Sequence, residues 1–282
     1  MTTQTQPFNL HPDIQINATI TSPPRSASPH SLPTPILLHF WGGSSRTWSL
    51  LTPLLSRGGY PTIALDLRGW GDSTGPSTDS GYTISAQAED VETIITKCLS
   101  PDLTKGGIIL IGLSMGAKIA QLIASRGTIP FLKGLVLISP APTTPLTLPP
   151  DMREQQLHAY DDENSAGFVA RNVLTLSFRD GSRELPAFLV EDMLRGHSLA
   201  KRAWPAYGMG EDVSANVGVI SVPTLVLAAD GDVVEPVERV QKEVVERIPG
   251  SRLVVLAGSG HLSPLDAPGA VAENVLGFLR EL

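Results

Sequence analysis

The sequence is poor in cysteine and in long apolar runs, and each shortage excludes a class of protein. A single cysteine, Cys98, excludes an intramolecular disulfide and any metal site built from several cysteines. No apolar run approaches the roughly eighteen residues that a membrane span needs, so we expect no membrane protein. The first residues, MTTQTQPFNLHPDIQ, have neither the basic start nor the apolar core of a secretory signal. These shortages predict a cytoplasmic protein without a metal centre.

Positive charge is also in short supply. The chain carries 21 Lys and Arg against 28 Asp and Glu, a net charge of −7. A nucleic-acid partner requires a basic face, so we expect no such partner. Hydrophobic residues make up 41% of the chain, which is enough to build a large core and excludes wholesale disorder. A length of 282 residues fits one large domain or two small ones.

Short segments rich in Ile, Val and Leu alternate with helical patterns along most of the chain. Segments that are apolar at nearly every position suit strands buried on both faces, as in a parallel sheet. The alternation predicts an α/β fold with a mostly parallel sheet and helices on both faces. The expected strands are 14–20, 36–40, 62–67, 108–113, 135–139, 224–229 and 253–257, and the expected helices are 47–57, 84–99, 115–126, 237–248 and 264–282.

One interval, residues 143–216, breaks this alternation. It contains no good strand, its pattern is helical with Pro and Gly breaks, and it carries eleven acidic and seven basic residues. We interpret it as a helical lid inserted over the carboxyl end of the sheet, which leaves a core domain made of residues 1–142 and 217–282. A Pro- and Ser-rich stretch at 21–35 predicts a surface loop after the first strand.

The strongest motif lies at residues 112–116, which read GLSMG between an apolar strand and a helical pattern. A serine on a sharp strand-to-helix turn projects its hydroxyl above the sheet, and glycines two residues before and after it let the two backbones approach. The helix start behind the serine offers N–H groups to a developing oxyanion. Ser114 is therefore the predicted nucleophile.

A serine nucleophile needs a base, and the base needs an acid to orient it. His261 follows the apolar run 253–257 in a GSGHL segment, so it lies at the carboxyl edge of the last strand. The strand 224–229 leads into Asp230 and Asp232, and both are candidates for the acid. We favour Asp232, which lies further into the loop and is free to face His261, whereas Asp230 is expected to cap the turn. The other histidines that we considered lie in the amino-terminal tail (His11, His30) or in the lid (His158, His197).

The oxyanion requires two backbone donors. One follows from position, the amide of Met115 directly after the nucleophile, and the other should come from the HFWGGS loop after an early strand, where Trp41 is our candidate. Phe40, Trp204 and Tyr207 are the candidate substrate-pocket residues, because they place aromatic side chains in this loop and in the lid.

Five motifs in this order, HFWGGSSRTW, DLRGWGDS, GLSMG, LVLAADGDVVEP and GSGHL, resemble the α/β-hydrolase superfamily, in its small lidded esterase, haloperoxidase and epoxide-hydrolase-like branch. The resemblance covers nearly all of the chain outside the lid. It implies Ser114 as nucleophile, Asp232 as acid and His261 as base, with an ion pair between Asp66 and Arg68 in the DLRGWGDS turn. The chain departs from the family where Phe40 replaces the usual glycine after His, which should narrow the acyl pocket.

These residues predict a cofactor-free serine hydrolase that cleaves an ester, lactone or similar acyl bond of a small, largely uncharged substrate. Relatives that open epoxides carry Asp at the nucleophile position, so Ser114 disfavours that reaction. A haloperoxidase, perhydrolase or carbon–carbon bond hydrolase would use the same triad. A non-catalytic protein that binds small molecules is the third alternative.

Overall fold

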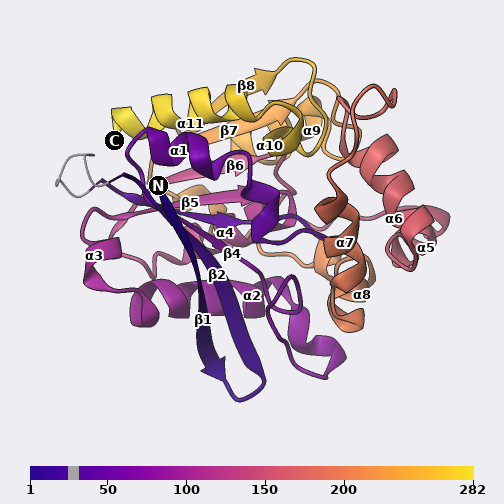
Figure 1. The fold of residues 1–282 in the computed structure, drawn as a ribbon, viewed down its shortest axis with the longest axis horizontal. Coiled ribbons are helices and arrows are strands. Elements are labelled where there is room, and N and C mark those ends of the chain that lie inside the picture. The colour runs from indigo at the N-terminus through magenta and orange to yellow at the C-terminus, as the bar shows by residue number, and fades with distance from the viewer. Residues whose placement is uncertain (25–31) are drawn as a thin grey trace.

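A computed structural model describes residues 1–24 and 32–282 and shows an α/β fold around one eight-stranded sheet (Figure 1). The strands are β1 (Thr2–His11), β2 (Ile14–Ser22), β3 (Thr34–Leu38), β4 (Thr62–Leu65), β5 (Ile108–Leu113), β6 (Leu132–Ile138), β7 (Thr224–Ala229) and β8 (Arg252–Leu256). Across the sheet their order is β1-β2-β4-β3-β5-β6-β7-β8. The six strands from β3 to β8 run parallel, whereas β2 pairs antiparallel with both β1 and β4.

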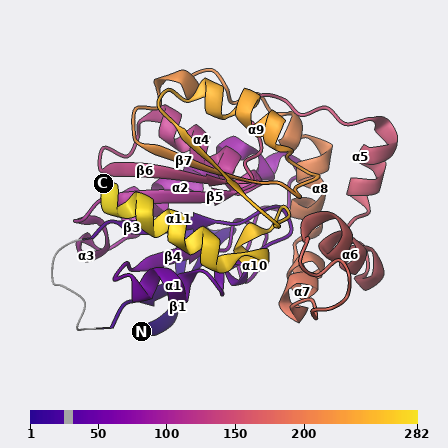
Figure 2. The ribbon, with the colours of Figure 1, turned by 90° about the horizontal axis from the view of Figure 1, so that it is seen from above.

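Helices cover both faces of the sheet, as the alternating sequence pattern predicts. The core helices are α1 (Thr52–Arg57), α2 (Ile84–Thr93), α3 (Pro101–Thr104), α4 (Met115–Arg126), α9 (Val237–Glu243), α10 (Ser263–Asp266) and α11 (Pro268–Glu281). In Figure 2, α1, α10 and α11 lie on one side of the sheet and α4 and α9 on the other, and α2 packs against α4. Every residue of β3, β5 and β7 is buried as a result, which explains their dense Ile, Leu and Val content. In the described part of the chain, no helix combines the length and apolar character needed to cross a membrane.

The amino-terminal residues form a strand that the sequence analysis missed. We expected a tail containing His11, but residues Thr2–His11 pair with β2 along most of their length. The prediction was wrong because β1 is an edge strand with mostly exposed Thr, Gln and Asn side chains, so it carries little apolar signal. Of the expected loop at 21–35, residues 25–31, and with them His30, lie outside the described residues.

Several expected helices are shorter than their patterns. The segment 47–57 divides into a 3₁₀ turn, η1 (Ser45–Trp48), and α1, and the segment 264–282 divides into α10 and α11. Both α1 and α11 have a proline in their first two positions. Proline is tolerated there because the N–H groups of the first helical turn make no hydrogen bond within the helix. In the segment 84–99, a π-helical turn (Ile94–Cys98) follows α2, and in 237–248 a 3₁₀ turn (Val245–Arg247) follows α9.

Between β6 and β7 the chain forms four further α-helices, α5 (Pro150–Leu157), α6 (Glu163–Val169), α7 (Ala187–Arg195) and α8 (Ser198–Ala206). We call residues 143–216 the lid segment. Figures 1 and 2 show its helices beyond the carboxyl ends of the parallel strands. Its two ends meet, because the amide of Val213 donates to the carbonyl of Thr143 at 2.9 Å. The buried Lys118 of α4 joins them, with its Nζ 3.4 Å from the Thr144 carbonyl and 3.2 Å from that of Met209; burial lowers the pKa of Lys118 to about 8.

The expected ion pair between Asp66 and Arg68 does not form. Arg68 instead makes two hydrogen bonds to the buried carboxylate of Asp90 in α2, from Nε at 2.6 Å and from Nη2 at 2.7 Å. Asp66 accepts from the backbone amides of Ser45 and Asp72. The prediction was wrong because the carboxylate is already used in closing its own turn, and the fold brings Asp90 to Arg68 from 22 residues away.

Candidate active site

Ser114 stands on a strained turn between β5 and α4. Its φ angle is +54°, one of two positive φ values among the non-glycine residues that the structure describes. The strain follows from crowding, because a Cβ at Gly116 would collide with the carbonyl oxygen of Leu38, and a Cβ at Gly112 would collide with that of Gly116. Strand and helix therefore turn tightly at this position and hold the Ser114 side chain at the carboxyl edge of the sheet.

Asp232 and His261 meet at the same edge, on the loops after β7 and β8. The distance from His261 Nδ1 to Asp232 Oδ2 is 2.9 Å, and both side chains are almost completely buried. The second carboxylate oxygen of Asp232 accepts from the amides of Val234 and Glu235 at 2.8 and 2.9 Å. With its acid fully bonded in this way, the imidazole donates through Nδ1 and leaves Nε2 available as an acceptor.

The charges of this pair stabilise each other. Burial opposes ionisation of Asp232, but the neighbouring His261 and the hydrogen bonds to the carboxylate hold its pKa below the usual range. Burial likewise favours the neutral form of His261, yet the charge and hydrogen bond of Asp232, with a contribution from Glu235, raise the pKa of the imidazole. The site therefore favours protonation of His261 while Asp232 stays ionised.

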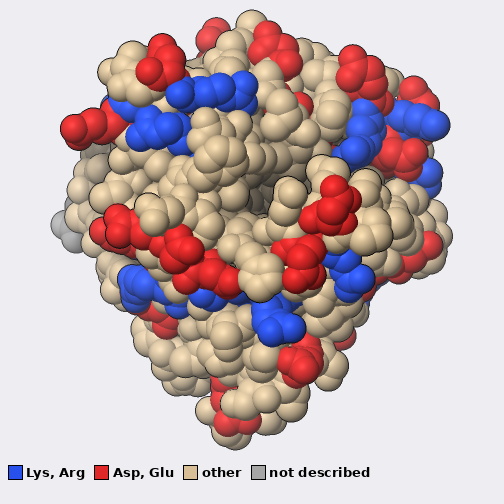
Figure 3. Space-filling view, turned by 90° about the vertical axis from the view of Figure 1, so that its right-hand side faces the viewer, with Lys and Arg blue, Asp and Glu red and all other residues tan. Residues whose placement is uncertain are grey.

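Ser114 and His261 both line a cavity of about 550 Å³ between the sheet and the lid segment. Figure 3 looks onto this side of the molecule and shows a hollow bordered largely by uncharged atoms. No hydrogen bond joins the Ser114 hydroxyl to His261 within the described residues; such contacts often tighten only when substrate binds. The cavity is lined by Phe40, Trp41, Ser114, Met152, Gln155, Gln156, His158, Ala159, Tyr160, Ser165, Phe168, Val169, Val173, Leu174, Trp204, Val234 and His261.

Two backbone amides, one on the cavity-lining Trp41 and one directly after Ser114, are free to bind an anion in the described structure. Neither the amide of Trp41 nor that of Met115 donates a backbone or side-chain hydrogen bond within the described residues. Met115 is the first residue of α4, so its amide also lies at the positive end of the helix. These are the two amides that the sequence pattern proposes as oxyanion donors.

The lid segment holds Trp41 in place. Pro205 in α8 has no N–H to donate to the carbonyl of Lys201 four residues earlier, and the indole Nε1 of Trp41 donates to this carbonyl at 2.9 Å. Tyr160 donates its hydroxyl to the carbonyl of Trp41 at 2.9 Å, and the two rings pack with centroids 4.2 Å apart. Gly42 leaves room for this ring, since a Cβ there would come within 2.6 Å of the Tyr160 hydroxyl oxygen.

Phe40, which replaces the family's usual glycine, fits into the loop without removing the candidate donors. Its ring is buried and lines the cavity, and its carbonyl accepts from the amide of Gly43 at 3.0 Å. His39 secures the same loop, because its Nε2 accepts from the amide of Leu67 at 3.0 Å and its Nδ1 lies 2.6 Å from the Phe40 carbonyl. Burial lowers the pKa of His39 to about 4, so this histidine stays neutral and has a structural role.

The structure brings together most, but not all, of the residues singled out in the sequence. Of the two candidate acids only Asp232 reaches His261; Asp230 instead accepts from the amide of Gly258 at 2.8 Å. Trp204 lines the cavity, whereas Tyr207 lies outside the lining and donates its hydroxyl to the carbonyl of Asp79. No group of three or more His, Cys, Asp or Glu side chains in residues 1–24 and 32–282 is placed to hold a metal ion.

The remaining described histidines serve local roles. His11 is exposed at the end of β1. His197 accepts from the amide of Leu199 at the start of α8 and stacks on Tyr82. His158 lines the mouth of the cavity, where hydrogen bonds to Asp161 and Glu154 raise its pKa.

Glu235 is a residue of this site that the sequence analysis missed. Its side chain is 2% exposed, three residues after Asp232, and its Oε2 lies 3.3 Å from the guanidinium of Arg239. Burial raises the pKa of Glu235 to about 7, with His261 and Arg239 opposing the shift. Its position directly before Pro236 reads as a helix start, so only the folded structure reveals a second carboxylate near the imidazole.

Known proteins resemble this chain over most of its length. The model of the alpha/beta hydrolase family matches residues 36–274. An AB hydrolase superfamily protein of Bacillus subtilis, YisY, is 30% identical over 236 residues, which cover 80% of this chain and 84% of that protein. A non-heme chloroperoxidase of Kitasatospora aureofaciens, CPO-A1, is 27% identical over 241 residues, again covering 80% and 84% of the two chains.

Solved structures share the fold at lower identity. An esterase from Exiguobacterium antarcticum superposes with a TM-score of 0.77 at 22% identity and covers 95% of this chain and 96% of its own. An enol-lactonase from Burkholderia xenovorans LB400 superposes with a TM-score of 0.80 at 19% identity, covering 98% and 100%. Since the family model spans most of the sequence and YisY is similar across most of both chains, this chain belongs to the alpha/beta hydrolase family.

Proposed function

We propose that this protein is a serine hydrolase that cleaves an ester, lactone or similar acyl bond of a small, largely uncharged substrate. The observation that carries the proposal is the constellation around one cavity: Ser114 and His261 line it, and Asp232 holds His261 at 2.9 Å. A hydroxyl, an oriented imidazole and a buried carboxylate are the parts that nucleophilic acyl transfer requires.

In the first half of the reaction, the Ser114 hydroxyl attacks the substrate carbonyl carbon and its proton passes to Nε2 of His261. The negative charge that forms on the carbonyl oxygen is stabilised by the amides of Trp41 and Met115, each worth about 2.7–4 kcal/mol in comparable sites. Asp232 fixes the imidazole tautomer and stabilises the imidazolium. The carbon–oxygen bond to the alcohol then breaks, the alcohol takes the proton from His261, and an acyl-enzyme remains.

In the second half, a water molecule replaces the alcohol. His261 accepts its proton as the oxygen attacks the acyl carbon, the same two amides stabilise the second oxyanion, and the bond to Ser114 breaks. Ser114 recovers its proton from His261, and the carboxylic acid leaves.

The cavity lining supports a substrate with an apolar body. Phe40, Trp41 and Trp204 lie near the nucleophile with aliphatic side chains of the lid segment, whereas Gln155, His158 and other polar side chains come from α5 and the residues around it. A cavity of about 550 Å³ falls in the range that takes a small organic ligand.

Hydrolysis of p-nitrophenyl acetate and butyrate tests this proposal. We expect the wild-type protein to hydrolyse them and Ser114→Ala to abolish turnover, and a fluorophosphonate probe should label the wild type at Ser114 only. Ser56→Ala, which alters a buried serine of α1 outside the cavity lining, serves as a control that should still react with the probe. Undiminished turnover by Ser114→Ala would rule out the assignment.

A second candidate, perhydrolase or haloperoxidase activity, is favoured by the similarity to non-heme chloroperoxidases. Hydrogen peroxide would replace water in attacking the acyl-enzyme and release a peracid. Peroxide-dependent bromination in acetate buffer that is lost in Ser114→Ala would favour this reaction. Absence of both turnover and probe labelling would favour the third alternative, a protein that only binds small molecules.

A further inference from the structure

Trp204 separates the cavity that contains Ser114 from a second, inner cavity. The inner cavity is lined by Trp70, Tyr82, Ile84, Gln87, Met115, Ala200, Ala203, Trp204 and Gly208. Among the described residues, Trp204 alone lines both spaces. Ser114 faces the outer cavity and the next residue, Met115, lines the inner one, so the partition lies directly beside the nucleophile.

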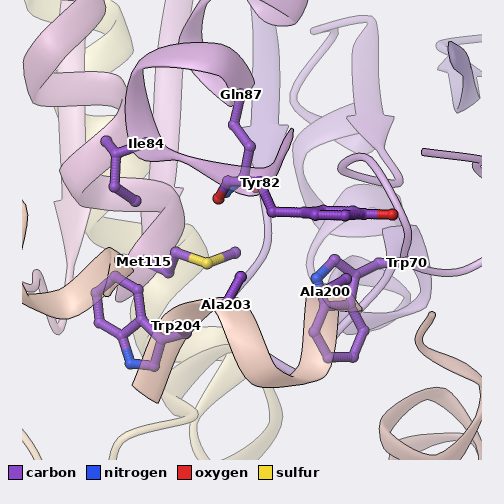
Figure 4. Close-up of a pocket in the computed structure, with 9 residues that line it drawn as sticks. Trp70, Tyr82, Ile84, Gln87, Met115, Ala200, Ala203 and Trp204 are labelled. Carbon is purple, nitrogen blue, oxygen red and sulfur yellow. The ribbon is translucent and has the colours of Figure 1, made fainter. Parts of the chain in front are cut away.

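The inner cavity is small, and most of the residues that line it have apolar or aromatic side chains. Its volume is about 10 Å³, enough for one water-sized group. In Figure 4, the indole of Trp204 lies beside Met115, Tyr82 and Trp70 form the opposite wall, and Gln87 reaches in from α2. Small side chains, Ala200 and Ala203, form the rest of the wall on α8. The bulk of Trp204 therefore limits the space at this end.

Trp204 is held by packing rather than by hydrogen bonds. Its indole N–H donates no hydrogen bond within the described residues, whereas the indole of Trp41 donates to Lys201 on the same helix. Trp204 can therefore be replaced without leaving a broken hydrogen bond, and removing its rings joins the two cavities.

The acyl part of a substrate should point toward Trp204. The leaving alcohol must face His261, which protonates it. The cavity wall beside His261 is formed by the π-helical turn η4 (Ala170–Leu174), because the amide of Leu262 donates to the carbonyl of Leu174 at 2.8 Å. Trp204 belongs to the other wall, formed by α8, which binds Trp41 through Lys201. An acyl chain directed away from His261 then runs along the Trp41 side toward Trp204.

We propose that Trp204 sets the acyl-chain length of the substrate by closing the inner end of the acyl pocket. The proposal rests on the hydrolase function proposed above. It implies that the wild-type protein acts on esters of short acyl chains. It also implies that longer acyl chains enter the inner cavity once the indole of Trp204 is removed.

The test compares p-nitrophenyl esters from acetate to dodecanoate in the wild type, Trp204→Ala and Phe168→Ala. Phe168 is the matched control, because it is an aromatic residue of the same outer cavity but is 63% exposed and does not touch the inner one. Each newly buried methylene is worth roughly a fourfold gain in kcat/KM. We expect the octanoate-to-butyrate ratio of kcat/KM to rise about tenfold or more in Trp204→Ala and to stay within about twofold in Phe168→Ala.

An unchanged ratio in Trp204→Ala, or an equal rise in Phe168→Ala, would overturn the proposal. If Trp204→Ala does not fold, Trp204→Leu retains an apolar side chain and should show the same change to a smaller extent. Thermal stabilisation by a series of alkanols from butanol to decanol separates the two proposals. If Trp204→Ala is stabilised more by longer alkanols but the wild type hydrolyses no ester, the role of Trp204 is supported and the hydrolase function is refuted. If the wild type hydrolyses esters but Trp204→Ala shows no change in chain-length preference, only the role of Trp204 is refuted.

Discussion

Replacing Tyr160 by phenylalanine tests whether the lid segment positions the Trp41 amide. Tyr160→Phe removes the hydroxyl that donates to the Trp41 carbonyl at 2.9 Å but retains the ring that packs on Trp41 with centroids 4.2 Å apart. The aromatic contact is therefore kept, and the loss is one buried hydrogen bond. Because the Trp41 carbonyl is left without this donor, we expect the free energy of unfolding to fall by about 1–3 kcal/mol.

The catalytic effect should be larger than that of an ordinary buried hydrogen bond far from the site. A missing oxyanion donor costs about 2.7–4 kcal/mol, and this is the upper limit if the Trp41 peptide swings away completely. The indole bond to Lys201 remains, so we expect a partial displacement and a fall of about tenfold in kcat, equal to about 1.4 kcal/mol. KM for p-nitrophenyl butyrate should change little, because the contact acts mainly in the transition state.

Urea unfolding and steady-state kinetics on the same preparations measure the two effects. Tyr60→Phe is a suitable control, since Tyr60 is also buried but lies outside the cavity and its hydroxyl makes no hydrogen bond within the described residues. A variant Tyr160→Phe that loses stability but keeps the wild-type kcat would refute the idea that this contact holds an oxyanion donor.

Three further variants test the same site. Asp232→Asn should lower kcat by about four orders of magnitude with the fold intact, measured by ester hydrolysis and circular dichroism, because the amide no longer fixes the required tautomer of His261. In Glu235→Gln, the acid limb of the kcat/KM profile should move to lower pH, because the charge of Glu235 favours the imidazolium and raises the pKa of His261. In the folded protein the pKa of Glu235 is raised from 4.5 to about 7, so the free energy of unfolding falls as pH rises through this window. Thermal unfolding at pH 8 should therefore show Glu235→Gln more stable than the wild type. Gly116→Ala should prevent soluble expression or lower Tm by many degrees, because its Cβ would collide with the Leu38 carbonyl. Gly277→Ala in α11, where a Cβ meets nothing within 4 Å, should be mild.

The sequence predicted the parts of the site that depend on neighbouring residues along the chain. Ser114 follows a strand and precedes a helix, and the carboxyl ends of parallel strands meet at one edge, so the order of motifs places Ser114, Asp232 and His261 together. The apolar runs of the central strands are similarly strong signals because those strands are buried on both faces.

Contacts between distant segments could not be predicted in this way. The pairing of Arg68 with Asp90, rather than with Asp66, depends on how α2 packs on the loop after β4. Tyr207 lies six positions beyond Lys201 and reads as a pocket residue, yet the end of α8 turns its hydroxyl toward the carbonyl of Asp79. Such outcomes depend on how segments that are distant in the sequence pack together, and this packing leaves no local pattern in the sequence.

The bonds between Trp41 and the lid segment limit how freely the two parts of the protein can be recombined. The carbonyl that receives the Trp41 indole is available because Pro205 lacks an N–H, and the hydroxyl on the Trp41 carbonyl belongs to Tyr160. A chimaera that receives the lid of a relative should lose both hydrogen bonds that support Trp41 in the loop proposed to bind the oxyanion. A lid from a relative can therefore replace this one only if it supplies a carbonyl left free by a proline and a buried tyrosine at the corresponding positions. A chimaera whose lid lacks these two groups should fold but hydrolyse its substrate slowly.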